Sequence, residues 1–413
     1  MKKTVFIIGL LSLTSLVCLP IGKANAQTAY VTNEGTNNIY VIDVTTNIVT
    51  DIISGCNHPY GVSVSSDGAR VYVTTQAANT VSVINTATNT VIDTIEVGRF
   101  PGGISVSSDG MNVYVASQDD NAVRHITTSN NNVSAGIPVG TFPLGVCIIP
   151  NGTKVYVANM NSNTVSVINS VNDSVSATIA VGKSPSGITV NPVGNKVYVV
   201  NRGDSTISVI NTATDQVSDT IKLGSGGHCV CVSPDGSRVY VTTPFTNTLT
   251  VISTTTNTVI DTIGVGQGPN GVSVSPDGSK VYVVNTGSAT VSVINTGNNS
   301  VAATIITGTT ATGSMVEGFG NFISTYPVVT GLVSPDKMSP DIAVYPNPAE
   351  NDITVESTQK SMLEILNIQG QTVLQQQIQQ GKTDVDISGL AKGVCILKLS
   401  SNDKTEMIKI VKE

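Results

Sequence analysis

The sequence predicts an all-β fold, a seven-bladed β-propeller followed by a small β-sandwich of the immunoglobulin-like kind. Three observations predict it: a strict repeat, strand-like alternation inside each repeat, and a change of composition towards the C-terminal end. Tyrosines mark the repeat at intervals of 42 residues, as Tyr30, Tyr72, Tyr114, Tyr156, Tyr198, Tyr240 and Tyr282. A repeat of roughly 40 residues that holds four short strands has the size of a propeller blade.

The strands and turns of the repeat follow from residue type. In Thr80–Asn85 and Val91–Val97, Val and Ile alternate with Ser, Thr or Asp, as in a pleated strand with one bulky face and one small face. Asn85–Asn89 and Ser108–Gly110 hold the Asn, Asp and Gly residues of tight turns. Because one such unit cannot bury both faces of its sheet, we expect seven units to stack around an axis.

The ring must also close. The unit of Tyr30 lacks a preceding strand of the Gly-Val-Ser-Val type, whereas the seventh unit ends with a spare one, Gly313–Val316. We therefore expect the strand at 313–316 to lie innermost in the blade that begins at Tyr30. The predicted propeller spans residues 27–322.

The N-terminal end has the pattern of a secretory signal. Lys2 and Lys3 precede an apolar run, Val5–Leu19, and Ala24-Asn-Ala26 provides a cleavage site. We expect residues 1–26 to be a signal peptide that is removed, which leaves a mature chain with no transmembrane segment.

Composition narrows the class of partner. The formal net charge is −7 over 413 residues, and the repeats contain no cluster of Lys and Arg, so we expect no nucleic-acid partner. The cysteines beyond the signal are odd in number and scattered, which does not suggest a disulfide framework: Cys56, Cys147, Cys229, Cys231 and Cys395.

The repeat ends before the last quarter of the chain. Residues 323–340 contain Pro327, Pro335 and Pro340 and are expected to form a linker. Residues 341–413 are expected to form the separate β domain. Its strand-like runs are Ile353–Ser357, Met362–Ile368, Thr372–Gln377, Asp384–Ile387 and Val394–Leu399.

The repeats resemble a known family. The segments Tyr30–Asn33, Tyr156–Asn159, Tyr198–Asn201 and Tyr282–Asn285 read Tyr-Val-x-Asn, and each is followed by motifs such as Thr80–Asn85. They are similar to the YVTN family of β-propellers, which includes surface-layer-type proteins and is related to haem d1 and lactonase-like propellers. The resemblance implies a fold, and fold alone does not settle function.

The tail resembles the C-terminal sorting domain of type IX secretion in Bacteroidetes-type Gram-negative bacteria. The residues that carry the resemblance include Tyr345, Pro346, Asn347, Pro348, Gly370, Gly393 and Lys412. Two departures are Cys395, where the family commonly has an aromatic residue, and Glu413 after the usual terminal lysine. The resemblance implies recognition by the type IX machinery, secretion across the outer membrane, and a place at the cell surface or outside the cell.

The candidate site lies where the repeats differ most. These are the loops that lead into the innermost strands and the loops that join the second and third strands; the second set contains Gln76, Gln118, Met160 and Phe245. A constant frame with variable loops is typical of a binding surface, although drift in exposed loops gives the same pattern. As ligand-binding residues, for a glycan, an anion or a protein, we single out Tyr60, Arg99, Phe100, Lys183, Arg202, His228 and Asn270.

Two other functions stay open. A lactonase- or lyase-like enzyme would recruit Glu34, Asp119, Asp120, Asp204 and His228, but no nucleophile motif supports it. A copper or haem site would use His58 and His228 with Cys56 and Cys229, but these pairs stand four repeats apart. We therefore expect a non-catalytic protein without metal or cofactor, and a structural role for His125.

Overall fold

The computed structural model describes residues 28–307, 316–317, 342–345, 351–366, 372–390, 393–400 and 405–412. The expected signal peptide and the expected linker lie outside these residues. Seven antiparallel sheets follow one another along residues 28–317. Blade 1 is β29-β1-β2-β3, and blades 2 to 7 take the strands β4 to β28 in chain order. The described residues form strands and turns and contain no helix.

The strands take the same place in each blade. The innermost strands are β29 (Val316–Glu317), β4 (Pro59–Val64), β8 (Pro101–Val106), β13 (Pro143–Ile148), β17 (Pro185–Val190), β21 (Val230–Val232) and β25 (Pro269–Val274). The second strands are β1 (Thr28–Asn33), β5 (Arg70–Thr75), β9 (Asn112–Ser117), β14 (Lys154–Asn159), β18 (Lys196–Asn201), β22 (Arg238–Thr243) and β26 (Lys280–Asn285).

The third strands are β2 (Asn38–Asp43), β6 (Thr80–Asn85), β10 (Ala122–Thr127), β15 (Thr164–Asn169), β19 (Thr206–Asn211), β23 (Thr248–Ser253) and β27 (Thr290–Asn295). The outer strands are β3 (Ile48–Ser54), β7 (Thr90–Glu96), β16 (Ser174–Ala180), β20 (Gln216–Lys222), β24 (Thr258–Gly264) and β28 (Ser300–Ile306). In blade 3 the outer strand is split into β11 (Asn132–Val133) and β12 (Ile137–Pro138), a break that the repeat pattern does not predict.

Each tyrosine of the repeat is buried and faces the next blade. In blade 4 the Tyr156 hydroxyl donates to Asp215 Oδ1 of blade 5 at 2.5 Å, and Lys154 Nζ contacts the other carboxylate oxygen at 2.7 Å. Asp215 ends the turn between β19 and β20 with φ of 54°, a left-handed conformation that Asn and Asp tolerate. We call such an interface between successive blades a seam.

The seam between blades 3 and 4 shows why His125 is structural. Asn112 takes the place of the basic residue of blades 2 and 4 to 7 and is too short to reach across. His125 bridges the gap, because its Nε2 lies 2.8 Å from Asn112 Oδ1 and its Nδ1 lies 2.8 Å from Asp173 Oδ2. Its ring stacks on Tyr114 with the centroids 4.7 Å apart.

The asparagine that closes the Tyr-Val-x-Asn segments supports the frame rather than a site. In blade 5, Asn201 is fully buried, and its Nδ2 donates to Thr206 Oγ1 and Ser208 Oγ at 3.0 and 2.9 Å. A Cβ at Gly182 would lie 2.7 Å from Asn201 Cγ, so the repeat needs glycine there.

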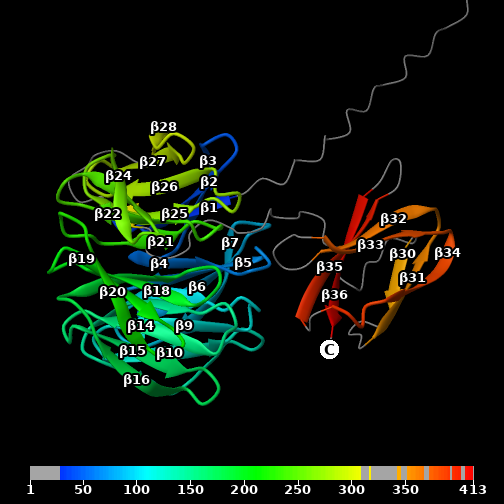
Figure 1. The fold of residues 1–413 in the computed structure, drawn as a ribbon, viewed down its shortest axis with the longest axis horizontal. Helices are drawn as coiled ribbons and strands as arrows, with labels where there is room; N and C mark the ends of the chain where they lie inside the picture. The colour runs from blue at the N-terminus through cyan, green and yellow to red at the C-terminus, as the bar shows by residue number, and fades with distance from the viewer. Residues whose placement is uncertain are drawn as a thin grey trace, which may run out of the picture.

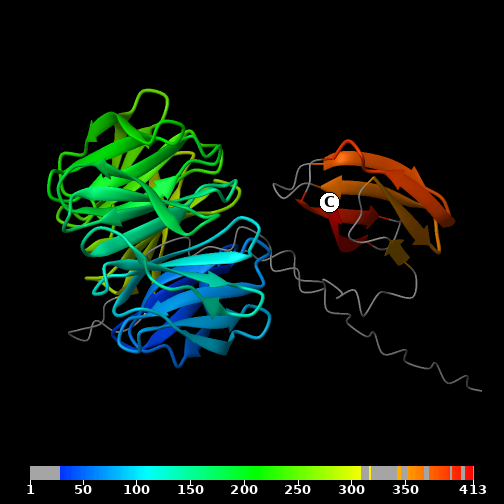
Figure 2. The ribbon, with the colours of Figure 1, turned by 90° about the horizontal axis from the view of Figure 1, so that it is seen from below.

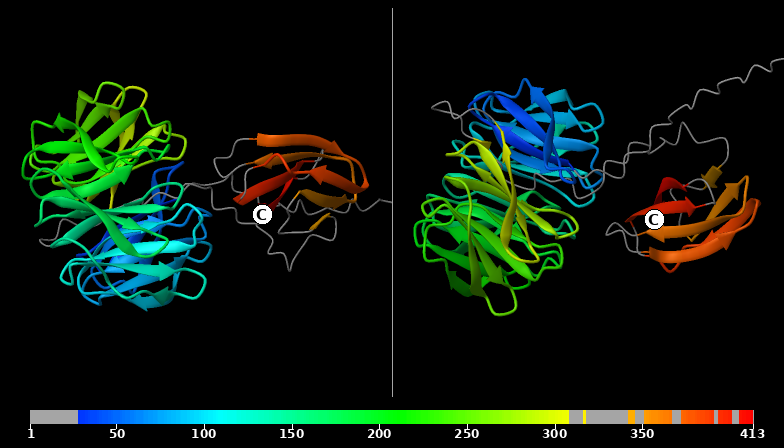
Figure 3. Two further views of the ribbon diagram at one scale, coloured as in Figure 1. Left: turned by 60° about the horizontal axis from the view of Figure 1, so that its bottom comes forward. Right: turned by 90° about the horizontal axis from the view of Figure 1, so that it is seen from above.

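The ring is closed by two separate sets of contacts. Val316 of β29 pairs with Asn33 of β1, while Gly313 to Met315 lie outside the described residues. In the seam between blades 7 and 1, Tyr282 donates to Asn47 Oδ1 at 2.8 Å and Lys280 Nζ donates to the Val44 carbonyl at 2.6 Å. Figures 1 and 3 show the blue strands of blade 1 beside the yellow-green strands of blade 7.

The tail forms two sheets. One sheet has the order β30 (Ile342–Tyr345), β31 (Asp352–Ser357), β34 (Gly381–Asp386), and the other has the order β33 (Thr372–Ile378), β32 (Ser361–Leu366), β35 (Gly393–Ser400), β36 (Thr405–Lys412). Val355 and Val385 of the first sheet share a core with Leu363 and Leu397 of the second, as in a sandwich. Figure 2 shows these strands, coloured orange to red, gathered into one β unit.

Candidate functional site

The two sets of variable loops lie on one face of the ring, which we call the loop face. In blade 5 the loop after β18 is bonded to the loop that leads into β17, because Gly203 N donates to the Lys183 carbonyl at 2.9 Å. Neighbouring blades are linked too, since Phe100 N donates to Asn79 Oδ1 at 2.9 Å. The side chains that differ between repeats therefore stand on a rigid, hydrogen-bonded base.

The residue just before the first proline of an innermost strand adopts a left-handed conformation. Its φ is 51° at His58 and Phe100, 55° at Phe142, 52° at Ser184 and 59° at Gly268. Glycine adopts this conformation without strain, whereas a bulky residue is disfavoured by roughly 1 kcal/mol or more. The Phe100 side chain is nevertheless 42% exposed, so packing does not explain its presence.

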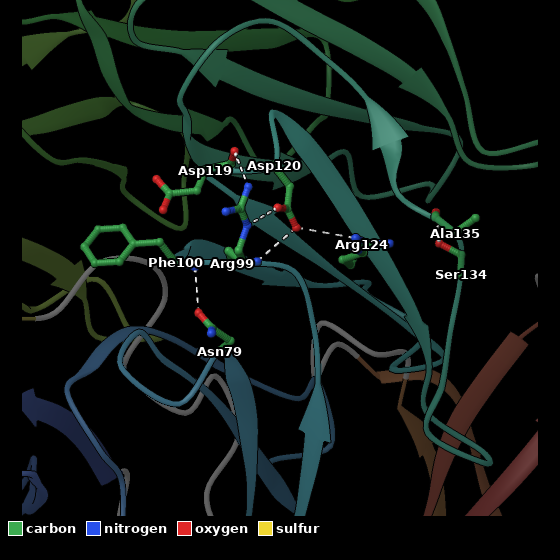
Figure 4. A network of polar contacts seen from close by, with 8 residues as sticks. All are labelled: Asn79, Arg99, Phe100, Asp119, Asp120, Arg124, Ser134 and Ala135. Atoms are coloured by element: carbon green, nitrogen blue, oxygen red, sulfur yellow. Dashed lines mark hydrogen bonds and ion pairs between the residues drawn. The ribbon is translucent and has the colours of Figure 1, made fainter.

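Arg99 is held by carboxylate and backbone contacts in blade 3. Asp120 Oδ1 lies 2.8 Å from Arg99 Nε, and Asp120 Oδ2 accepts from Arg99 N at 3.0 Å and from Arg124 Nη2 at 3.5 Å. Hydrogen bonds from Arg99 lower the pKa of Asp120, and the same carboxylate raises the pKa of Arg99. Figure 4 shows the Phe100 ring pointing away from this pair.

The other candidate cations, Lys183 and Arg202, both lie in blade 5. Asp204 accepts from Lys183 N at 2.6 Å, while the Lys183 side chain is exposed. The Arg202 guanidinium lies 5.4 Å from the centroid of the Phe245 ring, a cation–π contact. Phe245 is 69% exposed, so this ring and its cation form a second aromatic feature on the loop face.

Apolar side chains meet across the axis of the ring. Leu144 of blade 4 and Cys229 of blade 6 belong to one cluster, against which Tyr60 and Met160 pack. Blades 4 and 6 are separated by blade 5, because β13 contacts β17 and β17 contacts β21. Tyr60 thus lies in an apolar cluster over the axis rather than on an open rim. We call this group the axial cluster.

His228 and Asn270 lie together beside the axial cluster. Cys229 Sγ is 3.5 Å from His228 Nδ1 and 3.6 Å from Asn270 Oδ1. Burial, reinforced by the positive charge of Arg202, lowers the pKa of His228 to about 4, although a hydrogen bond with Asn270 opposes the shift. The imidazole is therefore neutral at pH 7.

Several residues named for the two other functions have partners within the fold. His58 Nδ1 lies 3.0 Å from Glu34 Oε1, while Cys56 is fully buried in the core between blades. Asp120 contacts Arg99 and Arg124. Within the described residues, no group of three or more His, Cys, Asp or Glu side chains is arranged to hold a metal ion.

The remaining cysteines of the propeller are packing residues. The described cysteines Cys56, Cys147, Cys229 and Cys231 are buried and form no disulfide. Burial raises the pKa of the Cys147 and Cys231 thiols, so both stay protonated. Each is paired with the tyrosine of its blade at a place where blades 2 and 7 have Ser63 and Ser273.

Sequence reasoning missed the pairing of Arg99 with Asp120 and the axial cluster. The first has a signal in the sequence, because the same hydrogen bond to a residue 21 positions later recurs from Thr141 to Ser162 and from Lys183 to Asp204. The axial cluster has no such signal in the sequence, since Leu144 and Cys229 meet only when the ring is closed.

In the tail, three of the sorting residues lie in described strands. Tyr345 ends β30, is 39% exposed and carries Lys382 Nζ 5.7 Å from its ring centroid. Gly393 pairs with Lys412 across β35 and β36. Pro346, Asn347, Pro348 and Gly370 lie outside the described residues. The described part of the chain holds no helix with the length and apolar character that a membrane span requires.

Comparison with known proteins supports both domains. Residues 22–110 and 193–277 match the model of the YNCE-like beta-propeller family, and residues 343–413 match that of the secretion system C-terminal sorting domain. A comparison with curated proteins finds no match.

Solved structures support the fold alone. A functionally unknown protein from Desulfotomaculum acetoxidans aligns with a TM-score of 0.63 at 18% identity, covering 71% of this chain and 99% of its own. Hydrazine synthase from Kuenenia stuttgartiensis aligns with a TM-score of 0.56 at 20% identity, covering 60% of this chain and 86% of its own. At such identities the likeness carries no chemistry. The chain thus carries a propeller similar to the YNCE-like family and a secretion system C-terminal sorting domain, which directs export by type IX secretion to the cell surface or the extracellular space.

Proposed function

We propose that the exported propeller is a non-catalytic scaffold whose loop face binds a ligand, which is a glycan, a protein or another surface component. The observation that carries the proposal is the exposed ring of Phe100 at a left-handed position. The same position holds Gly268 in blade 7, so the frame itself favours glycine there. An aromatic side chain that is both strained and exposed is explained by contact with a ligand.

The other exposed groups of the loop face suit the same role. Phe245 with Arg202 offers a ring and planar donors, and Arg99 is 68% exposed although it is paired with Asp120. Aromatic rings and guanidinium groups are the side chains most enriched in binding hot spots. Each is fixed by contacts within the protein, which reduces the entropy lost when a ligand binds.

The test uses Phe100→Gly in the full-length protein. Because glycine suits the backbone at this position, we expect a melting temperature within a few degrees of the wild type. We expect at least tenfold weaker binding on a panel of immobilised glycans and bacterial surface proteins. The control is Met111→Ala, which removes an exposed apolar side chain from the turn between β8 and β9, on the opposite face. Wild-type protein that binds no member of the panel, or Phe100→Gly protein that binds as well as wild type, contradicts the proposal.

A further inference from the structure

The loop between the second and third strands has a position at which only blade 6 carries a large apolar residue. Phe245 stands there, and its side chain is 69% exposed, so packing in the core does not explain it. The other six blades have a small or polar residue at this position: Gly35, Ala77, Asp119, Asn161, Gly203 and Gly287. A departure from the repeat that exposes an aromatic ring points to function.

The loop that leads into β21 leaves room for this ring. Gly226 stands where blades 2 to 5 have His58, Phe100, Phe142 and Ser184. A Cβ at Gly226 would lie 3.3 Å from Phe245 Cε2 and 3.0 Å from the Arg202 carbonyl oxygen. The ring of Phe245 therefore packs with one edge against the backbone at Gly226, which fixes it at the boundary of blades 5 and 6.

Arg202 supplies a cation at the same boundary. Its guanidinium lies 5.4 Å from the centroid of the Phe245 ring, and its N donates to the Ser184 carbonyl at 3.1 Å. None of the ion pairs among the described residues includes Arg202, whereas Arg99 is paired with Asp120 at 2.8 Å. The ring thus orients the guanidinium without neutralising it.

The surroundings of Arg202 leave its charge uncompensated. Burial, followed by the positive charge of Arg202, lowers the pKa of His228 to about 4, and a hydrogen bond with Asn270 opposes the shift. The imidazole is therefore neutral at pH 7. Asp204, the acidic residue nearest to Arg202 in the sequence, accepts from Lys183 N at 2.6 Å. Because the charges of Asp204 and Lys183 offset each other, the charge of Arg202 remains for an anionic ligand.

We propose that Arg202 and Phe245 bind a hexuronate unit, so that the ligand of the loop face is an acidic glycan. This inference rests on the proposed function and names the class of its ligand. The planar guanidinium matches a carboxylate with two parallel hydrogen bonds. The exposed ring presents an apolar surface to the C–H groups of a sugar ring.

Charge and shape favour a carboxylate over other anions. A carboxylate carries one negative charge, which one guanidinium neutralises, and its flat shape fits the guanidinium fork. A phosphate group carries roughly 1.5 to 2 negative charges at pH 7, and the excess would lie near Asp204 of the same loop. A sulfate group has a single charge but lacks the flat shape.

The experiment measures binding of the full-length protein to oligosaccharides of galacturonate, glucuronate and mannuronate by isothermal titration calorimetry. Their methyl esters serve as uncharged probes of the same shape, and a sulfated oligosaccharide of galactose tests the kind of anion. The variants are Arg202→Gln and Phe245→Gly, each of which installs a residue that stands at the same place in another blade, as in Gln118 and Gly203. The control is Lys222→Ala, which removes the same charge from the exposed end of β20, where Ala180 stands in blade 4.

We expect the wild type and Lys222→Ala to bind at least one hexuronate equally well, and its methyl ester at least tenfold more weakly. Arg202→Gln should weaken binding of that hexuronate at least tenfold, because a charge-assisted contact is lost, and Phe245→Gly should weaken it several-fold. Both variants should keep the melting temperature of the wild type. The affinity should fall as salt is added.

Several results would overturn the proposal: no hexuronate binding by the wild type, equal binding of a hexuronate and its methyl ester, tighter binding of the sulfated probe, or hexuronate binding that survives Arg202→Gln. An equal loss in Lys222→Ala would do so too, because it would reveal a general effect of charge. Binding of neutral glycans or surface proteins that is lost in Phe100→Gly but not in Arg202→Gln overturns this inference and leaves the proposed function in place.

Discussion

The seam between blades 4 and 5 repeats around the ring, whereas the entry to the innermost strand of blade 6, residues 227–229, departs from the repeat; we call this entry the mouth of blade 6. In the seam, residues at fixed repeat positions make the contacts: Tyr156 and Lys154 both reach Asp215. At the mouth of blade 6, Cys229 stands where blades 2 to 5 and blade 7 have a glycine, and β21 is shortened to Val230–Val232. The comparison teaches that the repeat positions carry different tasks. Residues that recur in most blades make the contacts that stabilise the ring, whereas positions at which one blade differs are the places to look for function.

The largest expected effect comes from placing a side chain where the frame needs glycine. Gly145→Ala sets a Cβ 2.4 Å from the Ser186 carbonyl oxygen, so we expect a loss of about 3 kcal/mol in the free energy of unfolding. Cys229→Gly is the reciprocal change and should be neutral or stabilising. Urea denaturation measures both. Equal losses of unfolding free energy in the two variants would show that the glycine position of blade 4 and the cysteine position of blade 6 do not differ.

The next effect is a pH dependence that only the mouth of blade 6 produces. The unfolded chain binds a proton at His228 below about pH 6.5, but the folded chain does so only near pH 4. The free energy of unfolding should therefore fall by on the order of 2 kcal/mol as the pH drops from 6.5 to 4, and then level off. His228→Ser should remove this difference. A wild type and variant with parallel pH profiles would show that the imidazole is not desolvated.

A smaller effect on stability is expected from the repeat tyrosines, two of which can be compared. Tyr156→Phe removes a bond to Asp215, and we expect a loss of about 1.5 kcal/mol. Tyr198 is the matched control, because its buried hydroxyl has no hydrogen-bond partner, so Tyr198→Phe should be neutral or stabilising. Thermal denaturation of the two variants in parallel gives the comparison. A loss at Tyr198 as large as that at Tyr156 would be the contrary result.

The smallest effect concerns Asp120 on the loop face. Asp120→Ala removes the acceptor of Arg99 N and the ion pair, and we expect a loss of about 1 kcal/mol. Asp120→Ser should lose less, because Ser162 accepts the corresponding N–H of Thr141 in blade 4 at 2.6 Å. Since hydrogen bonds from Arg99 lower the pKa of Asp120, its contribution is present above about pH 4 and is lost as the pH falls through the folded-state pKa. A stability difference that persists unchanged at pH 2 would argue against the ion pair.

The sequence predicted the fold well because the period and the alternation of Val and Ile with small polar residues are local signals. It missed the split of the outer strand around Ser134 and Ala135, where Gly136 packs against Arg124. The shortened β21 could have been inferred from the missing proline at Gly227. The axial cluster could not, since Tyr60 and Leu144 are brought to one place by the curvature of the whole ring.

Blade 1 combines strands from the two ends of the propeller segment, and this arrangement determines when the blade can be completed during synthesis. Its second strand, β1, is the first strand of the ring to be made, while its innermost strand, β29, follows about 280 residues later. Until then β1 offers an unpaired edge, which is a template for pairing with other chains. The edge of β1 is covered only when Val316 and Glu317 have emerged, so the first blade to begin is the last to be completed.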